Sequence, residues 1–114
     1  AHILLGGGDP MEFLTDHYDR IIALHWKDAK AAYRGYTGPT PTRAMHAEEI
    51  LYKDLGSGGV DLPAVWHVLQ ARGYRYWITL DLDPPRPQEG EGTVEEKLLF
   101  NRRYLFEQLH VGEL

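Results

Sequence analysis

The chain has 114 residues, 43% of them hydrophobic and 25% charged, a formal net charge of −5 and no cysteine. This is enough for one small globular domain, without disulfides or thiolate zinc sites, and its acidic balance argues against a nucleic-acid partner. No apolar run approaches the roughly 20 residues of a membrane helix. The absence of cysteine fits a cytoplasmic protein, and it leaves His, Asp and Glu to hold any metal.

The first predicted element is a helix at residues 10–18, entered from a run of glycines. Asp9 is suited to cap the first amides, Pro10 to stand at the first helical position, and Glu12 to complete a capping box. We expect the helix to bury Phe13 and Leu14, with His17 at the margin of the buried face.

Two apolar runs, at residues 21–26 and 74–80, predict strands. Uninterrupted runs of this kind are typical of strands buried on both faces, as in parallel sheets covered by helices. The helical connection between these two requires them to run parallel. A lone parallel pair has two open edges, so we expect the chain to belong to a larger sheet, either as a fragment or through self-association.

A long connection at residues 29–60 separates the strands, and we interpret it as a lid or binding loop. Within it, Thr42 is suited to cap a short helix at about residues 43–53. A further helix is predicted from Asp61, as its cap, to about Arg72, with Gly73 as its stop. We expect Trp66 and Trp77 to lie in the core. Trp26 is also expected there, with a place in a pocket wall as the alternative.

Prolines and glycines predict a loop at residues 84–92, and Thr93 with Glu96 forms a capping box for a last helix. Its apolar side chains are Val94, Leu98, Phe100, Leu105 and Leu109. The predicted order of elements makes residues 1–114 one domain of the α/β class.

His25 and Asp81 are the first polar residues at the ends of the two strands. Ligands and chemistry gather at the carboxyl ends of parallel strands, so these side chains are expected to converge. An imidazole with a carboxylate suits Zn²⁺, Mn²⁺ or Co²⁺. The alternative is that His25 is a buried structural histidine.

Lys27 should share the face of His25, because side chains alternate along a strand, while Asp28 points away or caps the following loop. Lys27 is then placed to bind an oxyanion or hydroxyl of a substrate, or to form an ion pair with Asp28 or Asp83. His46 is the only histidine of the long connection, and nothing in its spacing requires it to meet a substrate.

Several short motifs follow one another in an order that resembles the last quarter to third of xylose isomerase-like TIM-barrel proteins. This superfamily includes sugar isomerases and epimerases, inosose dehydratases and apurinic endonucleases of the endonuclease-four type. The matching motifs are His2, Asp9-Pro10, His25-Trp26-Lys27-Asp28, the segment Leu55-Gly56-Ser57-Gly58-Gly59-Val60-Asp61, and Asp81. The resemblance implies a C-terminal fragment, about the last three βα units, of a TIM (β/α)8 barrel, with parallel strands flanked by helices. It places the first residues, with His2, at the tail of the sixth strand of that barrel.

The same resemblance implies a role for each matching residue. His25 and Asp81 correspond to metal ligands, with Asp81 also catalytic, and His2 and Lys27 to substrate-binding residues. The family usually has a glutamate where this chain has Asp81. An aspartate expected three residues before His2, and a glutamate from an earlier strand, fall outside this sequence, so half of the ligand set is present.

The function implied for the longer parent protein is that of an enzyme acting on a sugar or cyclitol with a divalent metal, Mn, Co, Zn or Mg. It would isomerise, epimerise or dehydrate its substrate by α-proton abstraction through an enediolate, and the fragment alone would be inactive. One alternative is an apurinic endonuclease, which needs further lid histidines and a basic surface. The other is a non-catalytic module that forms homo-oligomers or associates with the missing part of the barrel.

Overall fold

The computed structural model describes residues 1–112 and divides into two compact units, Ala1–Asp81 and Leu82–Leu114. It is a mixed helix and strand structure with parallel strands, as the α/β class requires. In the described part of the chain, no helix combines the length and the apolar character needed to cross a membrane.

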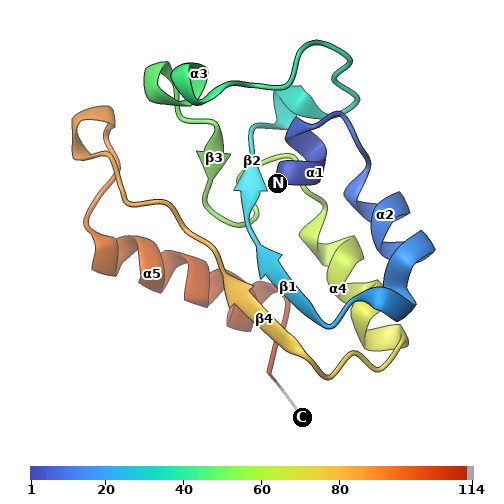
Figure 1. Ribbon diagram of the computed structural model, residues 1–114. Helices are drawn as coiled ribbons and strands as arrows, with labels where there is room; N and C mark the ends of the chain where they lie inside the picture. Colours follow the sequence, from blue (N-terminus) through green and yellow to red (C-terminus); the bar gives the residue numbers. More distant parts are fainter. Residues whose placement is uncertain (113–114) are drawn as a thin grey trace. The chain divides into compact units, whose positions relative to one another are not determined.

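Two short parallel strands form the centre of the first unit (Figure 1). Strand β1 (Ala23–Trp26) pairs with β4 (Trp77–Leu80), and His25 stands opposite Thr79 in the register. The predicted parallel pairing is confirmed. Both strands begin later than the apolar runs suggested, so Ile22 and Tyr76 lie outside the pairing.

The β1–β4 pair is covered on one face and open on the other. Trp26, on the covered face, is 3% exposed and meets the edge of Trp66 from α4 (Leu62–Ala71), with ring centroids 6.2 Å apart. By contrast, the opposite face, with Ala23, His25, Trp77 and Thr79, is exposed, and Trp77 is 83% exposed. The prediction of burial on both faces, and of Trp77 in the core, is therefore wrong, because helices cover one face alone within the first unit.

Helices α2 (Pro10–His17) and α4 pack against each other in the first unit (Figure 1). Asp9 accepts the amide of Met11 at 2.8 Å, which confirms the predicted cap. Leu14 is buried as expected, but Phe13 is 48% exposed. Its ring packs on His17 of the same helix, at a centroid distance of 4.8 Å, in place of the core.

The caps of α4 also agree with the sequence. Asp61 accepts the amide of Ala64 at 3.0 Å, and the helix ends before Gly73, whose φ of +66° favours glycine. These signals are local in sequence, so they hold whatever packs around the helix.

The first residues form a short helix, α1 (His2–Leu5), where the resemblance implied the end of a strand. The Leu5 amide donates to the carbonyl of Ala1 at 2.9 Å, and Leu4 and Leu5 are both buried. That expectation is corrected: without a strand partner, this backbone satisfies its hydrogen bonds within a helical turn.

The long connection contains two small strands that pair antiparallel, β2 (Asp28–Ala29) and β3 (Tyr52–Lys53). Helix α3 (Arg43–Glu48) lies between them in sequence, and Thr42 caps it by accepting the Met45 amide at 3.2 Å. The predicted helix is present but shorter than expected, because its last residues pair as β3.

Asp28 fixes the end of this connection. Its carboxylate is fully buried and accepts the amides of Ala29, Gly56, Gly58 and Val60 at 2.8 to 3.1 Å. This confirms the predicted loop-capping role, and it explains the glycine-rich sequence: the loop backbone must come close enough to surround one carboxylate.

Gly58→Ala is expected to lower the free energy of unfolding by about 3 kcal/mol, measured by urea denaturation. A Cβ atom there would lie 2.2 Å from the carbonyl oxygen of Ala29 and 2.3 Å from Oδ1 of Asp28. Gly73→Ala is the matched control, because its Cβ would meet nothing within 4 Å and adds only the strain of a positive φ, about 1 kcal/mol. Equal losses for the two variants would contradict a close approach at Gly58.

The second unit is built on α5 (Val94–Arg103), which continues as a π-helical turn at Tyr104–Gln108. The predicted capping box is confirmed, with Thr93 accepting the Glu96 amide and Glu96 accepting the Thr93 amide. The apolar residues of this segment differ in exposure: Leu105 and Leu109 are buried, while Val94, Leu98 and Phe100 are exposed.

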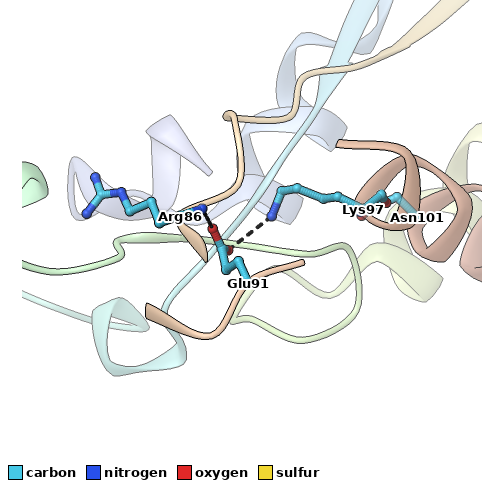
Figure 2. A network of polar contacts seen from close by, with 4 residues as sticks. All are labelled: Arg86, Glu91, Lys97 and Asn101. Carbon is cyan, nitrogen blue, oxygen red and sulfur yellow. Dashed lines mark hydrogen bonds and ion pairs between the residues drawn. The ribbon is translucent and has the colours of Figure 1, made fainter. Parts of the chain in front are cut away.

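A polar network ties the proline-rich loop to α5 within the second unit (Figure 2). Glu91 accepts the backbone amide of Arg86 at 2.6 Å and pairs with the Lys97 ammonium at 3.2 Å. The Asn101 amide, fully buried, donates to the carbonyl of Lys97 at 2.8 Å. A carboxylate bonded to both segments therefore links the loop after β4 to α5.

Candidate functional site

The candidate site lies at the carboxyl ends of β1 and β4. His25 and Asp81 converge there as predicted, with Nδ1 of His25 3.7 Å from Oδ2 of Asp81. The Asp81 amide donates to the carbonyl of Trp26 at 3.0 Å, which continues the strand pairing by one residue and fixes the Asp81 backbone. The His25 side chain is 67% exposed, so it is open to an approaching ligand.

Lys27 joins this pair from the end of β1. Its ammonium donates to Oδ1 of Asp81 at 3.1 Å, and its side chain is 8% exposed. The ion pair was predicted with Asp28 or Asp83, whereas this one joins Lys27 to Asp81, and Asp28 turns its own carboxylate to the loop amides. The structure brings together three of the predicted site residues: His25, Lys27 and Asp81.

The environment of Asp81 favours its ionised form. The hydrogen bond from Lys27 is the main cause that lowers its pKa below 3.8, with a smaller contribution from His25, while partial burial opposes them. Asp81 is therefore a carboxylate at neutral pH, with one oxygen bonded to Lys27 and the other facing His25.

Tyr52, which the sequence did not single out, lies beside this group. The Lys27 ammonium sits over its ring, 4.3 Å from the centroid. His2 and His46 approach the ring in edge geometry, with centroids 5.5 Å and 5.0 Å away. His2 and Lys27 therefore both contact the Tyr52 ring, and so does His46, the one histidine of the long connection.

No local signal pointed to Tyr52, because its contacts come from α1, from α3 and from the residue after β1, which are far apart in sequence. Only the pairing of β3 with β2, directly after Lys27, places the tyrosine next to the strand end.

A pocket of about 130 Å³ adjoins the site within the first unit. Its lining is mainly apolar, with Ile3, Phe13 and Leu24, and it includes His25 and Lys27. A small apolar recess with a few polar groups is the usual form of a ligand site.

The chemistry and spacing of His25 and Asp81 fit part of a divalent-metal site. Nitrogen and oxygen ligands about 2.1 Å from one tetrahedral ion lie about 3.4 Å apart, near the observed 3.7 Å. Across the described residues, no group of three or more histidine and acidic side chains is placed to hold an ion. The pair can therefore contribute two ligands, and a complete site needs others.

Comparison with curated proteins gives relatives of one kind. The chain is 30% identical over 84 residues to the rhizopine catabolism protein MocC of Rhizobium meliloti, covering 73% of this chain. It is 29% identical over 114 residues to an inosose dehydratase of Halalkalibacterium halodurans, covering 96% of this chain. An inosose dehydratase of Lacticaseibacillus casei is 24% identical over 100 residues, covering 85%.

These matches cover 26% to 35% of the relatives' own lengths, so the chain spans about a quarter to a third of the proteins it matches. No family model matches the chain, and no solved structure shows a significant match. The matches to curated proteins nevertheless agree with one another and extend over most of this chain. The chain is therefore related to the inosose dehydratases and to MocC, proteins of the xylose isomerase-like TIM-barrel family.

Proposed function

We propose that the chain is the C-terminal part of a TIM-barrel enzyme that dehydrates or isomerises a sugar or cyclitol with the help of a divalent metal. The observation that carries the proposal is the convergence of His25, Lys27 and Asp81 at the ends of adjacent parallel strands. In α/β barrels this edge of the sheet carries the active site.

The open sheet supports the fragment part of the proposal. Strands β1 and β4 pair with each other and with no further strand in residues 1–112, and the face that carries His25 and Trp77 is exposed. In a closed barrel, neighbouring strands would pair with both edges, and interior side chains would cover this face. The rest of a longer chain would supply these strands and the other metal ligands, so residues 1–114 alone would be inactive.

His25 and Asp81 would hold the ion in this scheme. The ion would be Mn²⁺, Co²⁺, Zn²⁺ or Mg²⁺. When bound, it would act as a Lewis acid and polarise a carbonyl group of the substrate. The lowered pKa of Asp81 makes it a weak proton acceptor, which favours its role as a ligand over that of a base. A second carboxylate, in the rest of the protein, would then remove the α-proton.

Lys27 would donate a hydrogen bond to a substrate oxygen, and His2 would lie at the outer side of the same group. Because Lys27 and Asp81 offset each other's charge, the group suits an uncharged polyhydroxylated substrate. After α-proton removal, loss of the β-hydroxyl gives dehydration, whereas return of the proton to a neighbouring carbon gives isomerisation. The names of the inosose dehydratase relatives favour the first outcome.

His25→Ala in the longer protein tests this function. We expect the affinity for Mn²⁺, measured by titration calorimetry, to fall at least about 100-fold, since even the loss of a residue that only orients a ligand costs 10- to 100-fold. Dehydration of inosose should be lost in parallel. His67→Ala, an exposed change on α4, is the control and should preserve both. Unchanged metal affinity and turnover in His25→Ala would reject the proposal.

A further inference from the structure

The Lys27 side chain needs more than one partner to hold its position. It is a flexible four-carbon chain ending in a charge, it is 8% exposed, and its carboxylate partner Asp81 is one-third exposed. Pairing with a partly solvated carboxylate does not by itself fix the rotamers of so flexible a side chain. The face of Tyr52 supplies a second attraction, because the electron-rich face of an aromatic ring binds cations within about 6 Å.

The ring itself is fixed from several directions. Tyr52 pairs with Ala29 in the β2–β3 ladder, directly beside the buried Asp28. Next to this pair, the Lys30 amide donates to the carbonyl of Leu51 at 2.9 Å. The backbone of Tyr52 is thus held by hydrogen bonds that do not involve Lys27.

The side chain of Tyr52 is also braced at its edges. His2 from α1 and His46 from α3 meet the ring at interplanar angles of 68° and 64°. Edge-to-face contacts of this kind favour one orientation of the ring over others. The ring therefore presents a defined face to Lys27.

We propose that Tyr52 is the positioning residue for Lys27: its ring face holds the ammonium in the orientation that donates to Asp81 and faces the substrate. The claim that Lys27 faces a substrate rests on the function proposed above, but the claim that Tyr52 positions Lys27 does not. Because Tyr52 stands at the end of the lid, the orientation of Lys27 depends on the lid being seated on the strand end. A substrate that enters with the lid displaced would meet a mobile lysine.

Side-chain NMR of the isotopically labelled 114-residue chain tests the positioning without a metal or substrate. Protons held over an aromatic face are shifted upfield, so the ε-methylene protons of Lys27 should lie upfield of those of Lys30 and Lys53 in the wild-type chain. They should also show nuclear Overhauser contacts with the Tyr52 ring. Tyr52→Phe keeps the ring face and should preserve both signals, whereas Tyr52→Leu should abolish both.

Tyr36→Leu is the matched control, because it removes a lid ring that packs on Tyr33, 4.9 Å away, and should leave the Lys27 signals unchanged. Survival of the upfield shift in Tyr52→Leu would overturn the proposal. The proposal would also be overturned if the ε-methylene protons of Lys27 in the wild-type chain had the same chemical shifts as those of Lys30 and Lys53. This second outcome needs no variant, so it decides the question even if Tyr52→Leu does not fold. The NMR experiment measures neither metal binding nor turnover, so its outcome is independent of whether the proposed function is correct.

Discussion

Asp28→Ala is expected to lower the free energy of unfolding by about 4 kcal/mol, the largest loss predicted for a single side chain here. The carboxylate is fully buried and accepts four backbone amides, one from Ala29 and three from residues 56–60 at the end of the long connection. Alanine would leave those donors without this acceptor, and hydrogen bonds to a charged acceptor contribute more than neutral ones. Urea denaturation followed by circular dichroism measures the loss.

Asp9→Ala is the matched control for Asp28, since its carboxylate accepts one amide at an exposed helix start. Loss of a helix cap of this kind costs about 1 kcal/mol. Asp28→Asn should fall between the two, because the amide side chain keeps one acceptor oxygen and turns an NH₂ group toward backbone donors. A loss for Asp28→Ala no greater than for Asp9→Ala would show that the four hydrogen bonds do not stabilise the lid.

Asp81→Asn is expected to lower the free energy of unfolding by about 2 kcal/mol at pH 7. It would deprive the buried Lys27 ammonium of the carboxylate it donates to. Removing one partner of a buried ion pair costs about 3 to 5 kcal/mol, and we reduce this value because Asp81 is one-third exposed. Urea denaturation of both chains over a range of pH measures the difference.

The pH dependence has a definite sign. The pKa of Asp81 is lowered by folding, mainly by the hydrogen bond from Lys27, so the folded state holds the ionised form more strongly than the unfolded chain. The wild type therefore keeps its full excess of unfolding free energy over Asp81→Asn at pH values above 3.8, the ordinary pKa of the carboxyl group. This excess is lost as the pH falls through the lowered pKa of the folded state.

Glu49→Gln is the control for Asp81→Asn, because it breaks the more exposed pairing of Glu49 with Lys30. We expect a much smaller loss of stability from it, as for surface ion pairs in general. A difference between wild type and Asp81→Asn that stays constant from pH 7 through acid would exclude the ion pair as its cause.

The features that the sequence predicted correctly depend on near neighbours or on chain connectivity. The caps Asp9, Asp61 and Thr93 act on amides two or three residues away, so their sequence signals are sufficient. The parallel pairing of β1 with β4 follows from the helical crossover between them. Once these strands are neighbours, the meeting of His25 and Asp81 follows, because both stand at strand ends.

The incorrect expectations concern burial, which depends on what packs over a side chain. An apolar run indicates that a strand can be buried on both faces, but Trp77 is exposed because only one face of the pair is covered within the first unit. Phe13 satisfies the helical pattern and still packs on His17, its neighbour one turn away. Tyr52 was missed because its contacts join distant segments, and no periodicity records them.

The backbone amides that donate to Asp28 anchor one end of the long connection, whereas its middle part has no such anchor to this carboxylate. Residues 56–60 are bonded through their backbone to a carboxylate next to Lys27, so a change in their length would displace the candidate site. Residues 37–41 are exposed or half-exposed, and sequence insertions are best tolerated in such segments. An engineer who wished to graft a new recognition loop onto this scaffold would place it there and leave the glycines beside Asp28 untouched.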